Sequence, residues 1–269
     1  MNILRSFQKI LMYSWVLVLF ILLNSCTQNN SLPERYERSY LEVVKDTFER
    51  NIPQADTLLA QQLKISQLEK KLLDSGLVNI LDIDSTIQVD VKYSTTDNFV
   101  GIDLYGELSS IYFQPEIAER LKSAQHTLKE IDSSLSLLIY DGTRPVSVQL
   151  KMWNALDTIP VNDRVKFVSN PKNGSIHNYG CAVDLTIMNT VTNDTLDMGA
   201  GFDDPRKIAY PKFEKDFLES GELSHEQYAN RLLLRKVMRS GGFWVLPTEW
   251  WHFNGFSRAA AKEKFSPIE

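Results

Sequence analysis

The sequence predicts an α+β fold, with a small mixed or antiparallel sheet flanked by helices in one main domain and a helical extension before it. Helix-type and strand-type patterns follow one another in mixed order over residues 77–269, which is typical of this class. Hydrophobic residues make up 43% of the 269 residues and charged residues 23%. This balance is that of an ordinary globular protein.

The first 25 residues are predicted to be a signal peptide. Arg5 and Lys9 give a positively charged start, and an apolar run of fourteen residues follows from Ile10 to Leu23. A run of this length suits the core of a signal peptide and is shorter than the ~20 residues that a membrane-spanning helix needs. The sequence therefore predicts export.

The apolar run ends in a motif that resembles the lipobox of bacterial lipoproteins. Leu23 stands three residues before Cys26, and the small residue Ser25 stands directly before it. Cleavage there would leave Cys26 as a lipid-bearing N-terminus, and each buried CH2 of the lipid would contribute ~0.8 kcal/mol to membrane binding. We expect an exported, membrane-anchored lipoprotein of the periplasm or cell envelope. The alternative is a plain signal peptide in which Cys26 has no role.

Residues 26–76 are expected to form a tether and a helical extension. Residues 27–36 are polar and contain a proline, as a tether does. Over residues 36–73 the apolar side chains recur at helical spacing, and Pro53 separates two such stretches. The simplest interpretation is an arm that leads away from the lipid or packs on the main domain.

Each element of the main domain is predicted from its own pattern. Apolar and polar residues alternate from Ile83 to Tyr93, which predicts a half-buried strand. Pro115 in a first turn, followed by an apolar stripe, predicts a helix. In chain order the later elements are a helix over 115–131, a strand over 135–140, a helix over 146–156, a strand over 182–188, a helix over 228–239, and strands over 243–246 and 250–253.

Charge and cysteine content limit the partners. The net charge is −5, so no basic surplus exists for phosphate backbones, and nucleic acid is not expected as a partner. The chain has two cysteines, and with Cys26 lipidated Cys181 would have no disulfide partner in the chain. A core of this size folds without disulfides.

Two of the four histidines lie near acidic residues in the sequence. His177 lies in a glycine-flanked turn, and Asp184 lies seven residues later on the strand that follows. A turn at residues 178–180 would let imidazole and carboxylate converge. Further along, His252 follows Glu249 by three residues. Two imidazoles and one carboxylate are a ligand set suited to zinc, with a fourth position for water, and Glu249 is placed to act as a general base.

Each of these features alone has a simpler interpretation. A single histidine beside a strand is more often packed or hydrogen-bonded, and a glutamate such as Glu249 before two tryptophans is usually a surface carboxylate. Together they resemble the zinc D-Ala-D-Ala peptidase superfamily, whose pattern is Ser-x-His-x-x-Gly-x-Ala-x-Asp followed by Glu-x-x-His. Residues 175–184 and 249–252 match that pattern.

Further stretches resemble the dipeptidase branch of that superfamily rather than its D,D-carboxypeptidases. They are residues 93–101, 141–145, 198–203 and 230–243. The resemblance covers residues 77 to about 256. Thr143 stands where the dipeptidases often have Tyr, and Cys181 where they often have Ser or another small residue. Both departures lie next to the expected site, so they bear on fine specificity rather than on the reaction type.

The resemblance implies one zinc ion per chain, held by His177, Asp184 and His252. It assigns the general base to Glu249, which would take the proton of the attacking water and pass it to the leaving amine. It assigns stabilisation of the tetrahedral oxyanion to Arg144, and losing such a donor typically costs ~10²–10³ in rate. The alternative for Arg144 is a structural ion pair in the Arg-Pro turn.

The resemblance also implies a group of supporting residues. Asp141 is expected to orient Arg144. Asp203 is expected to bind a free substrate amine, with a simple turn residue as the alternative. Ser175 and Tyr93 offer hydroxyls for a substrate carboxylate, and local hydrogen bonding is an alternative of similar weight.

The expected reaction is hydrolysis of the D-alanyl-D-alanine dipeptide to two D-alanines, in turnover of cell-wall peptides. A D,D-carboxypeptidase or endopeptidase that trims peptidoglycan stem peptides is the nearest alternative. A non-catalytic zinc-binding module is a third, and Glu249 argues against it because a pure binder needs no base beside the metal. The expected partners are a small dipeptide and the membrane, and the oligomeric state is left open.

Overall fold

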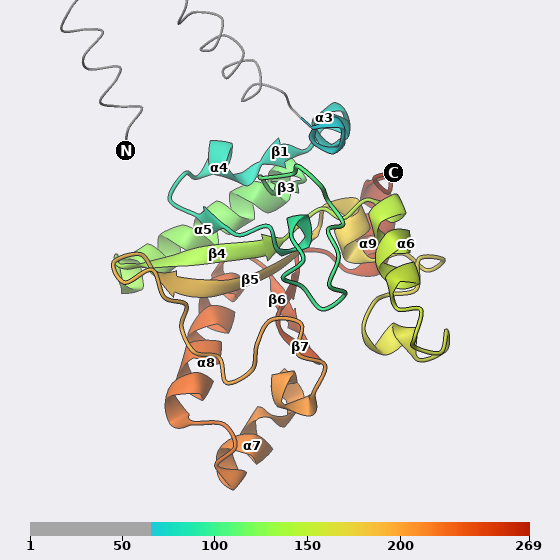
Figure 1. Ribbon diagram of the computed structural model, residues 1–269. Coiled ribbons are helices and arrows are strands. Elements are labelled where there is room, and N and C mark those ends of the chain that lie inside the picture. Colours follow the sequence, from blue (N-terminus) through green and yellow to red (C-terminus); the bar gives the residue numbers. More distant parts are fainter. Residues whose placement is uncertain (1–65) are drawn as a thin grey trace, which may run out of the picture. The chain divides into compact units, whose positions relative to one another are not determined.

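The computed structural model, shown in Figure 1, describes residues 66–269. Its centre is a five-stranded mixed sheet, in which one edge strand pairs in parallel and the other pairs are antiparallel. In spatial order the strands are β2 (Gln88–Val89), β4 (Leu135–Asp141), β5 (Ala182–Asn189), β7 (Glu249–Asn254) and β6 (Trp244–Leu246). A separate two-stranded sheet pairs β1 (Val78–Asn79) with β3 (Tyr112–Phe113). The α+β prediction is confirmed.

Two long helices, α5 (Pro115–Ile131) and α8 (His225–Ser240), pack with the sheet to form the main core. Alternate residues of a strand face opposite sides. In β5, Val183 and Leu185 belong to this core, so Asp184 between them points to the other face. The helices therefore cover one side of the sheet and leave the other side free to carry polar groups.

The remaining helices are short. They are α3 (Gln67–Asp74), α4 (Ile80–Ile83), α6 (Val146–Ala155), α7 (Glu214–Ser220) and α9 (Arg258–Lys264), with the 3-10 turns η1 (Lys92–Ser94), η2 (Arg164–Lys166), η3 (Ile176–Tyr179), η4 (Lys207–Ala209) and η5 (Pro211–Phe213). Among the described residues, none of these helices is long and apolar enough to cross a membrane.

The predicted strand from Ile83 to Tyr93 is wrong over most of its length. Only β2 pairs with β4, because α4 extends to Ile83 and η1 begins at Lys92. Between them Asp84 Oδ1 accepts hydrogen bonds from the backbone N–H and hydroxyl of Thr86, at 2.9 and 2.7 Å, which folds the chain into a tight turn. The apolar and polar residues alternate here because one side of this irregular edge segment is buried, although most of the segment is not a strand. The helix over 115–131 agrees with α5 to the residue.

Helix α3 is the part of the predicted extension that the structure describes. Ser66 caps it by accepting from the N–H of Glu69. Leu72 is fully buried in a second apolar cluster with Leu77 and Tyr93. Thus α3 packs on the domain, while the predicted signal peptide, Cys26 and the tether lie outside the described residues.

Candidate metal centre and substrate pocket

Strand register places three ionisable side chains in one row across the sheet. Asp184 of β5 lies opposite His252 of β7 and, on its other side, opposite Asp141 of β4. The next pair along, Val183 and Phe253, belongs to the main core, so Asp184 and His252 point to the opposite face. Directly opposed residues have Cβ atoms ~4.5–5.5 Å apart. Pairing alone therefore brings this carboxylate and imidazole together.

His177 reaches the row from the short turn η3. Ser175 and Asn178 form a capping box at its start, each side chain bonding the other residue's backbone N–H. Gly180 ends the turn with φ of +66°, in the left-handed region where glycine is favoured. The result is that His177 Nε2 lies 3.1 Å from His252 Nδ1.

Both imidazoles have their outer nitrogen bound to a fixed acceptor. His177 Nδ1 donates to the carbonyl of Gly142 at 2.7 Å, and His252 Nε2 donates to Asn254 Oδ1 at 3.0 Å. A neutral imidazole that donates through one nitrogen presents a lone pair on the other. His177 Nε2 and His252 Nδ1 therefore turn lone pairs toward each other and toward Asp184, whose Oδ1 is 2.9 Å from His252 Nδ1.

This arrangement fits a zinc ion. Two lone pairs and a carboxylate that converge repel one another unless a proton or a metal cation lies between them. The ligand atoms of His177, Asp184 and His252 all lie within 4.8 Å of one another. Zn–N bonds of 2.0–2.1 Å at tetrahedral angles need a nitrogen separation of ~3.3 Å, close to the 3.1 Å found. The acceptors on the outer nitrogens are the orienting partners that metal-binding histidines usually have.

Electrostatics agree with a cation site. Burial acts to raise the pKa of Asp184, but His177 and His252 lower it well below its usual value. Burial acts to lower the pKa of His252, yet the hydrogen bond that its imidazole can donate to the Asp184 carboxylate, together with the charges of Asp184 and Glu249, raises it to about 9. The centre therefore holds an anionic carboxylate and favours a positive charge.

Arg144 lies beside the centre, and each of its three guanidinium nitrogens makes a hydrogen bond. Its Nε and Nη2 both bond Asp141 Oδ2, the former at 3.1 Å, and its Nη1 donates to Gln149 Oε1 at 3.2 Å. Tyr105 donates to the other oxygen of Asp141 at 2.6 Å. Arg144 Nη2 is 3.8 Å from Asp184 Oδ2. The guanidinium is thus held in one orientation next to the three ligand groups.

Glu249 is the first residue of β7, and its Oε2 lies 3.9 Å from His252 Nδ1. Residues three apart on a regular strand face opposite sides. Here the β6–β7 register shifts between Val245 and Leu246, so the strand is irregular in this segment and Glu249 turns to the same side as His252. Burial raises the pKa of Glu249, and its side chain keeps about a third of its surface exposed, 32%.

Tyr93 and Asp203 meet on the far side of the pocket. The Tyr93 hydroxyl donates to the Asp203 carboxylate at 3.0 and 3.1 Å. The predicted hydroxyl for a substrate carboxylate is therefore directed at a carboxylate of the protein. Ser175, the other predicted hydroxyl, lies on the His177 side, where its Oγ accepts from the His177 N–H at 3.3 Å.

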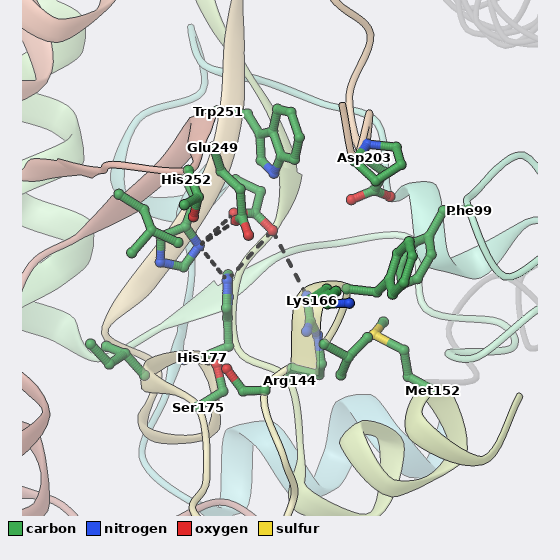
Figure 2. Close-up of a pocket in the computed structure, with 18 of the residues that line it drawn as sticks. Phe99, Arg144, Met152, Lys166, Ser175, His177, Asp203, Glu249, Trp251 and His252 are labelled. Atoms are coloured by element: carbon green, nitrogen blue, oxygen red, sulfur yellow. Dashed lines mark hydrogen bonds and ion pairs between the residues drawn. The ribbon is translucent and has the colours of Figure 1, made fainter. Parts of the chain in front are cut away.

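A cavity of about 160 Å³ joins these groups. That is below the ~300–1,000 Å³ of typical ligand pockets, which favours a small substrate. Figure 2 shows His177, His252 and Glu249 on one side of it and Asp203 and Phe99 on the other. The cavity also has an apolar part, lined by Phe99, Met152, Phe167 and Val168.

Several residues of the centre were missed by sequence reasoning. Asn254 carried a usable signal, because a residue two after His252 on a strand faces the same side. Gln149 and Tyr105 carried none, since they reach Arg144 and Asp141 only through the tertiary fold.

The two departures from the family pattern point away from the cavity. Thr143 Oγ1 donates to the carbonyl of Tyr112 at 2.6 Å, and Cys181 is buried in the main core.

Comparison with known proteins agrees with the resemblance in the sequence. A family model described as D-ala-D-ala dipeptidase matches residues 74–268. The D-alanyl-D-alanine dipeptidase of Escherichia coli (strain K12) is 32% identical over 177 residues, which are 66% of this chain and 83% of that protein. The D-alanyl-D-alanine dipeptidase of Enterococcus faecium is 29% identical over 196 residues, 67% of this chain and 92% of that protein. A solved LdcB LD-carboxypeptidase is similar at 17% identity and a TM-score of 0.35, with 56% of this chain and 63% of that chain covered.

Proposed function

Because this chain belongs to the D-Ala-D-Ala dipeptidase family and is therefore a metallopeptidase, we propose that it hydrolyses D-alanyl-D-alanine to two D-alanines, with one zinc ion bound by His177, Asp184 and His252. The observation that carries the proposal is the convergence of two imidazole lone pairs and a carboxylate beside Glu249 in a small cavity. A non-catalytic zinc module is disfavoured, because Glu249 would have no role there.

The protein groups divide the chemistry among them. His177, Asp184 and His252 would hold the zinc ion, which would supply Lewis-acid chemistry for activating water and polarising a carbonyl. Glu249 takes the proton of the attacking water and delivers it to the leaving amine. Its raised pKa makes Glu249 a stronger base toward that water than an ordinary glutamate is. Arg144, held by Asp141 and Gln149, stabilises the oxyanion that develops on the scissile carbonyl.

The two ends of the cavity suit the two ends of a zwitterionic dipeptide. Asp203 offers a carboxylate to the substrate ammonium, and Tyr93 orients that carboxylate. Burial and the charge of Asp184 raise the pKa of Asp203 well above its usual value, so a cationic partner would stabilise its charged form. At the other end the Ser175 hydroxyl, whose oxygen accepts from His177, can donate its proton to the substrate carboxylate.

The test is a substrate series with the zinc-loaded full chain in detergent. We expect turnover of D-Ala-D-Ala and none of its N-acetyl form, because acetylation removes the charge that Asp203 binds. L-Ala-L-Ala tests stereospecificity in the same assay. Efficient release of D-Ala from a D-Ala-D-Ala-terminated pentapeptide would contradict the dipeptidase assignment and favour a D,D-carboxypeptidase.

We further propose that the chain is an exported lipoprotein anchored through Cys26, and that it recycles D-Ala-D-Ala released from the cell wall. The support is the charged start, the apolar run and the Leu23–Cys26 motif. The Cys26→Ser variant should carry no lipid, so it should not partition into detergent as the wild type does. Equal partitioning of the two would place any lipid elsewhere.

A further inference from the structure

We propose that Arg231, a buried residue of α8 outside the pocket, is a positioning residue that sets the position of Asp203 and thereby the enzyme's recognition of a free substrate amine. The inference rests on the proposed function, in which Asp203 binds that amine. It concerns the segment of residues 197–208, called here the Asp203 loop, which runs past α8 between β5 and α7 (Figure 1).

Arg231 binds both ends of the Asp203 loop. Its Nε donates to the carbonyl of Met198 at 2.6 Å, and its Nη1 donates to the carbonyl of Ile208 at 3.0 Å. Asp203 lies midway between these two points in the sequence. The guanidinium has no exposed surface and does not line the cavity. Arg231 can therefore influence the substrate only indirectly, through the position of the loop.

Neighbouring residues hold the first half of the same loop. Asn230 Nδ2 donates to the carbonyl of Asp197 at 2.9 Å, and Gln227 Nε2 donates to the Asp197 carboxylate at 2.8 Å. From the sheet, Trp250 Nε1 donates to the carbonyl of Ala200 at 3.1 Å. The loop is thus tied by its backbone carbonyls to α8 and β7, and Arg231 is the group that closes it at both ends.

Asp203 needs such support. Its φ of +61° lies in the left-handed region, which residues other than glycine keep only when their surroundings hold them there. Phe202 beside it packs against Tyr140 and Trp251, with ring centroids 4.8 and 5.6 Å apart. A loop released at its ends would let Asp203 relax and move its carboxylate away from Tyr93.

An arginine suits this task for a geometric reason. Its planar fork offers five N–H donors in fixed directions, so one side chain reaches two carbonyls and a carboxylate at once. Glu214 supplies the counter-charge, 3.3 Å from Arg231 Nη1. Arg235, one turn further along α8, pairs with the same Glu214 through both terminal guanidinium nitrogens, at 2.8 and 2.6 Å. Arg235 is therefore a matched control, since it is tied even more closely to Glu214 but not to the loop.

The first experiment compares Arg231→Lys with Arg235→Lys in the zinc-loaded full chain. Lysine keeps the positive charge but cannot hold both carbonyls. We expect Arg231→Lys to raise KM for D-Ala-D-Ala by about 10- to 100-fold, the size of effect that a misplaced binding group produces, with kcat changed much less and zinc content unchanged. Arg235→Lys should lower Tm without that rise in KM. An equal KM rise in both variants would overturn the proposal, because the effect would then be one of general stability.

The second experiment removes the group through which Arg231 is proposed to act. In an Asp203→Asn background, Arg231→Lys should add little further loss in kcat/KM, since the two changes affect one interaction. Equal losses in the two backgrounds would show that Arg231 acts elsewhere and would overturn the proposal. If Arg231→Lys does not fold, Asn230→Ala serves in the same cycle, because it releases the Asp197 carbonyl alone. A wild type that does not cleave D-Ala-D-Ala would instead contradict the proposed function itself.

Discussion

The metal side and the amine side of the pocket are built in different ways. His252 and Asp184 are neighbours by strand register, and His177 is added by one short capped turn. Asp203, on the amine side, is at the centre of a loop held from α8 and β7 by side chains that never touch the cavity. The metal side is thus fixed by regular secondary structure, and the amine side by long-range hydrogen bonds to backbone carbonyls.

The difference suggests which properties each side can change. A ligand set fixed by a sheet has little freedom, because shifting the register by one residue would turn Asp184 to the core. A loop held at a few carbonyls can adopt a new shape when one anchor changes. We therefore expect mutations on the metal side to affect zinc content and kcat, and mutations on the amine side to affect KM and substrate choice.

The largest effect is expected on the metal side from His252→Ala. It removes one of the two lone pairs that face Asp184, so zinc affinity should fall by more than the ~10–100-fold that loss of an orienting partner produces. Elemental analysis after gel filtration, with an activity assay, measures this. Zinc retained at full occupancy in His252→Ala would show that the ligand set is wrong.

Glu249→Gln should separate catalysis from metal binding. Glutamine keeps the shape of the side chain but cannot accept the proton of the water, so kcat should fall by ~10²–10⁴, the usual contribution of a general acid–base group. Zinc content and Tm should stay near those of the wild type. If the variant keeps most of its activity, or loses its zinc, another residue is the base.

Asp203→Asn is the corresponding change on the amine side. It replaces a charge-assisted contact with a neutral one, so KM for D-Ala-D-Ala should rise by about 10- to 100-fold, while zinc content stays the same. Steady-state kinetics on D-Ala-D-Ala measure it. A fall in kcat at unchanged KM would place Asp203 with the catalytic groups and remove the contrast between the two sides.

Asn254→Ala should give a smaller effect on the metal side. The variant loses the acceptor that fixes the tautomer of His252, and such partners are typically worth ~10–100-fold in metal affinity or activity. Competition with a chromogenic chelator measures the affinity. Asn254→Asp, which keeps an acceptor, is the control and should retain tighter binding than Asn254→Ala.

The smallest effect is expected from Cys181→Ala. Burial raises the pKa of the Cys181 thiol to about 12, and the side chain lies in the main core, away from the cavity. Buried thiols of this kind are inert. The variant should therefore keep the wild-type kcat/KM, and iodoacetamide should not inhibit the folded wild type. Inhibition through Cys181 would indicate a thiol in the reaction.

The same contrast explains what the sequence could predict. The pairs His177–Asp184 and Glu249–His252 are local in sequence, and one turn is enough to bring the first pair together, whereas the second also needs an irregularity in its strand. Strand periodicity alone requires a bend between Glu249 and His252 if both are to face one metal ion, and the structure has that irregularity. The contact between Tyr93 and Asp203, and the support from Arg231, depend on loops whose paths no local pattern encodes. The length of the edge strand β2 was overestimated for a similar reason. The turn at Asp84 interrupts an otherwise regular alternation of apolar and polar residues.

Titration of zinc into metal-free protein measures whether each chain holds one catalytic zinc ion. The full chain is stripped with a chelator, zinc is added back in steps, and hydrolysis of D-Ala-D-Ala is followed at each step. We expect no activity without zinc, then a linear rise that reaches its plateau at one equivalent, and no such rise in His252→Ala. Full activity in the stripped protein, or a plateau only at two equivalents, would contradict this expectation.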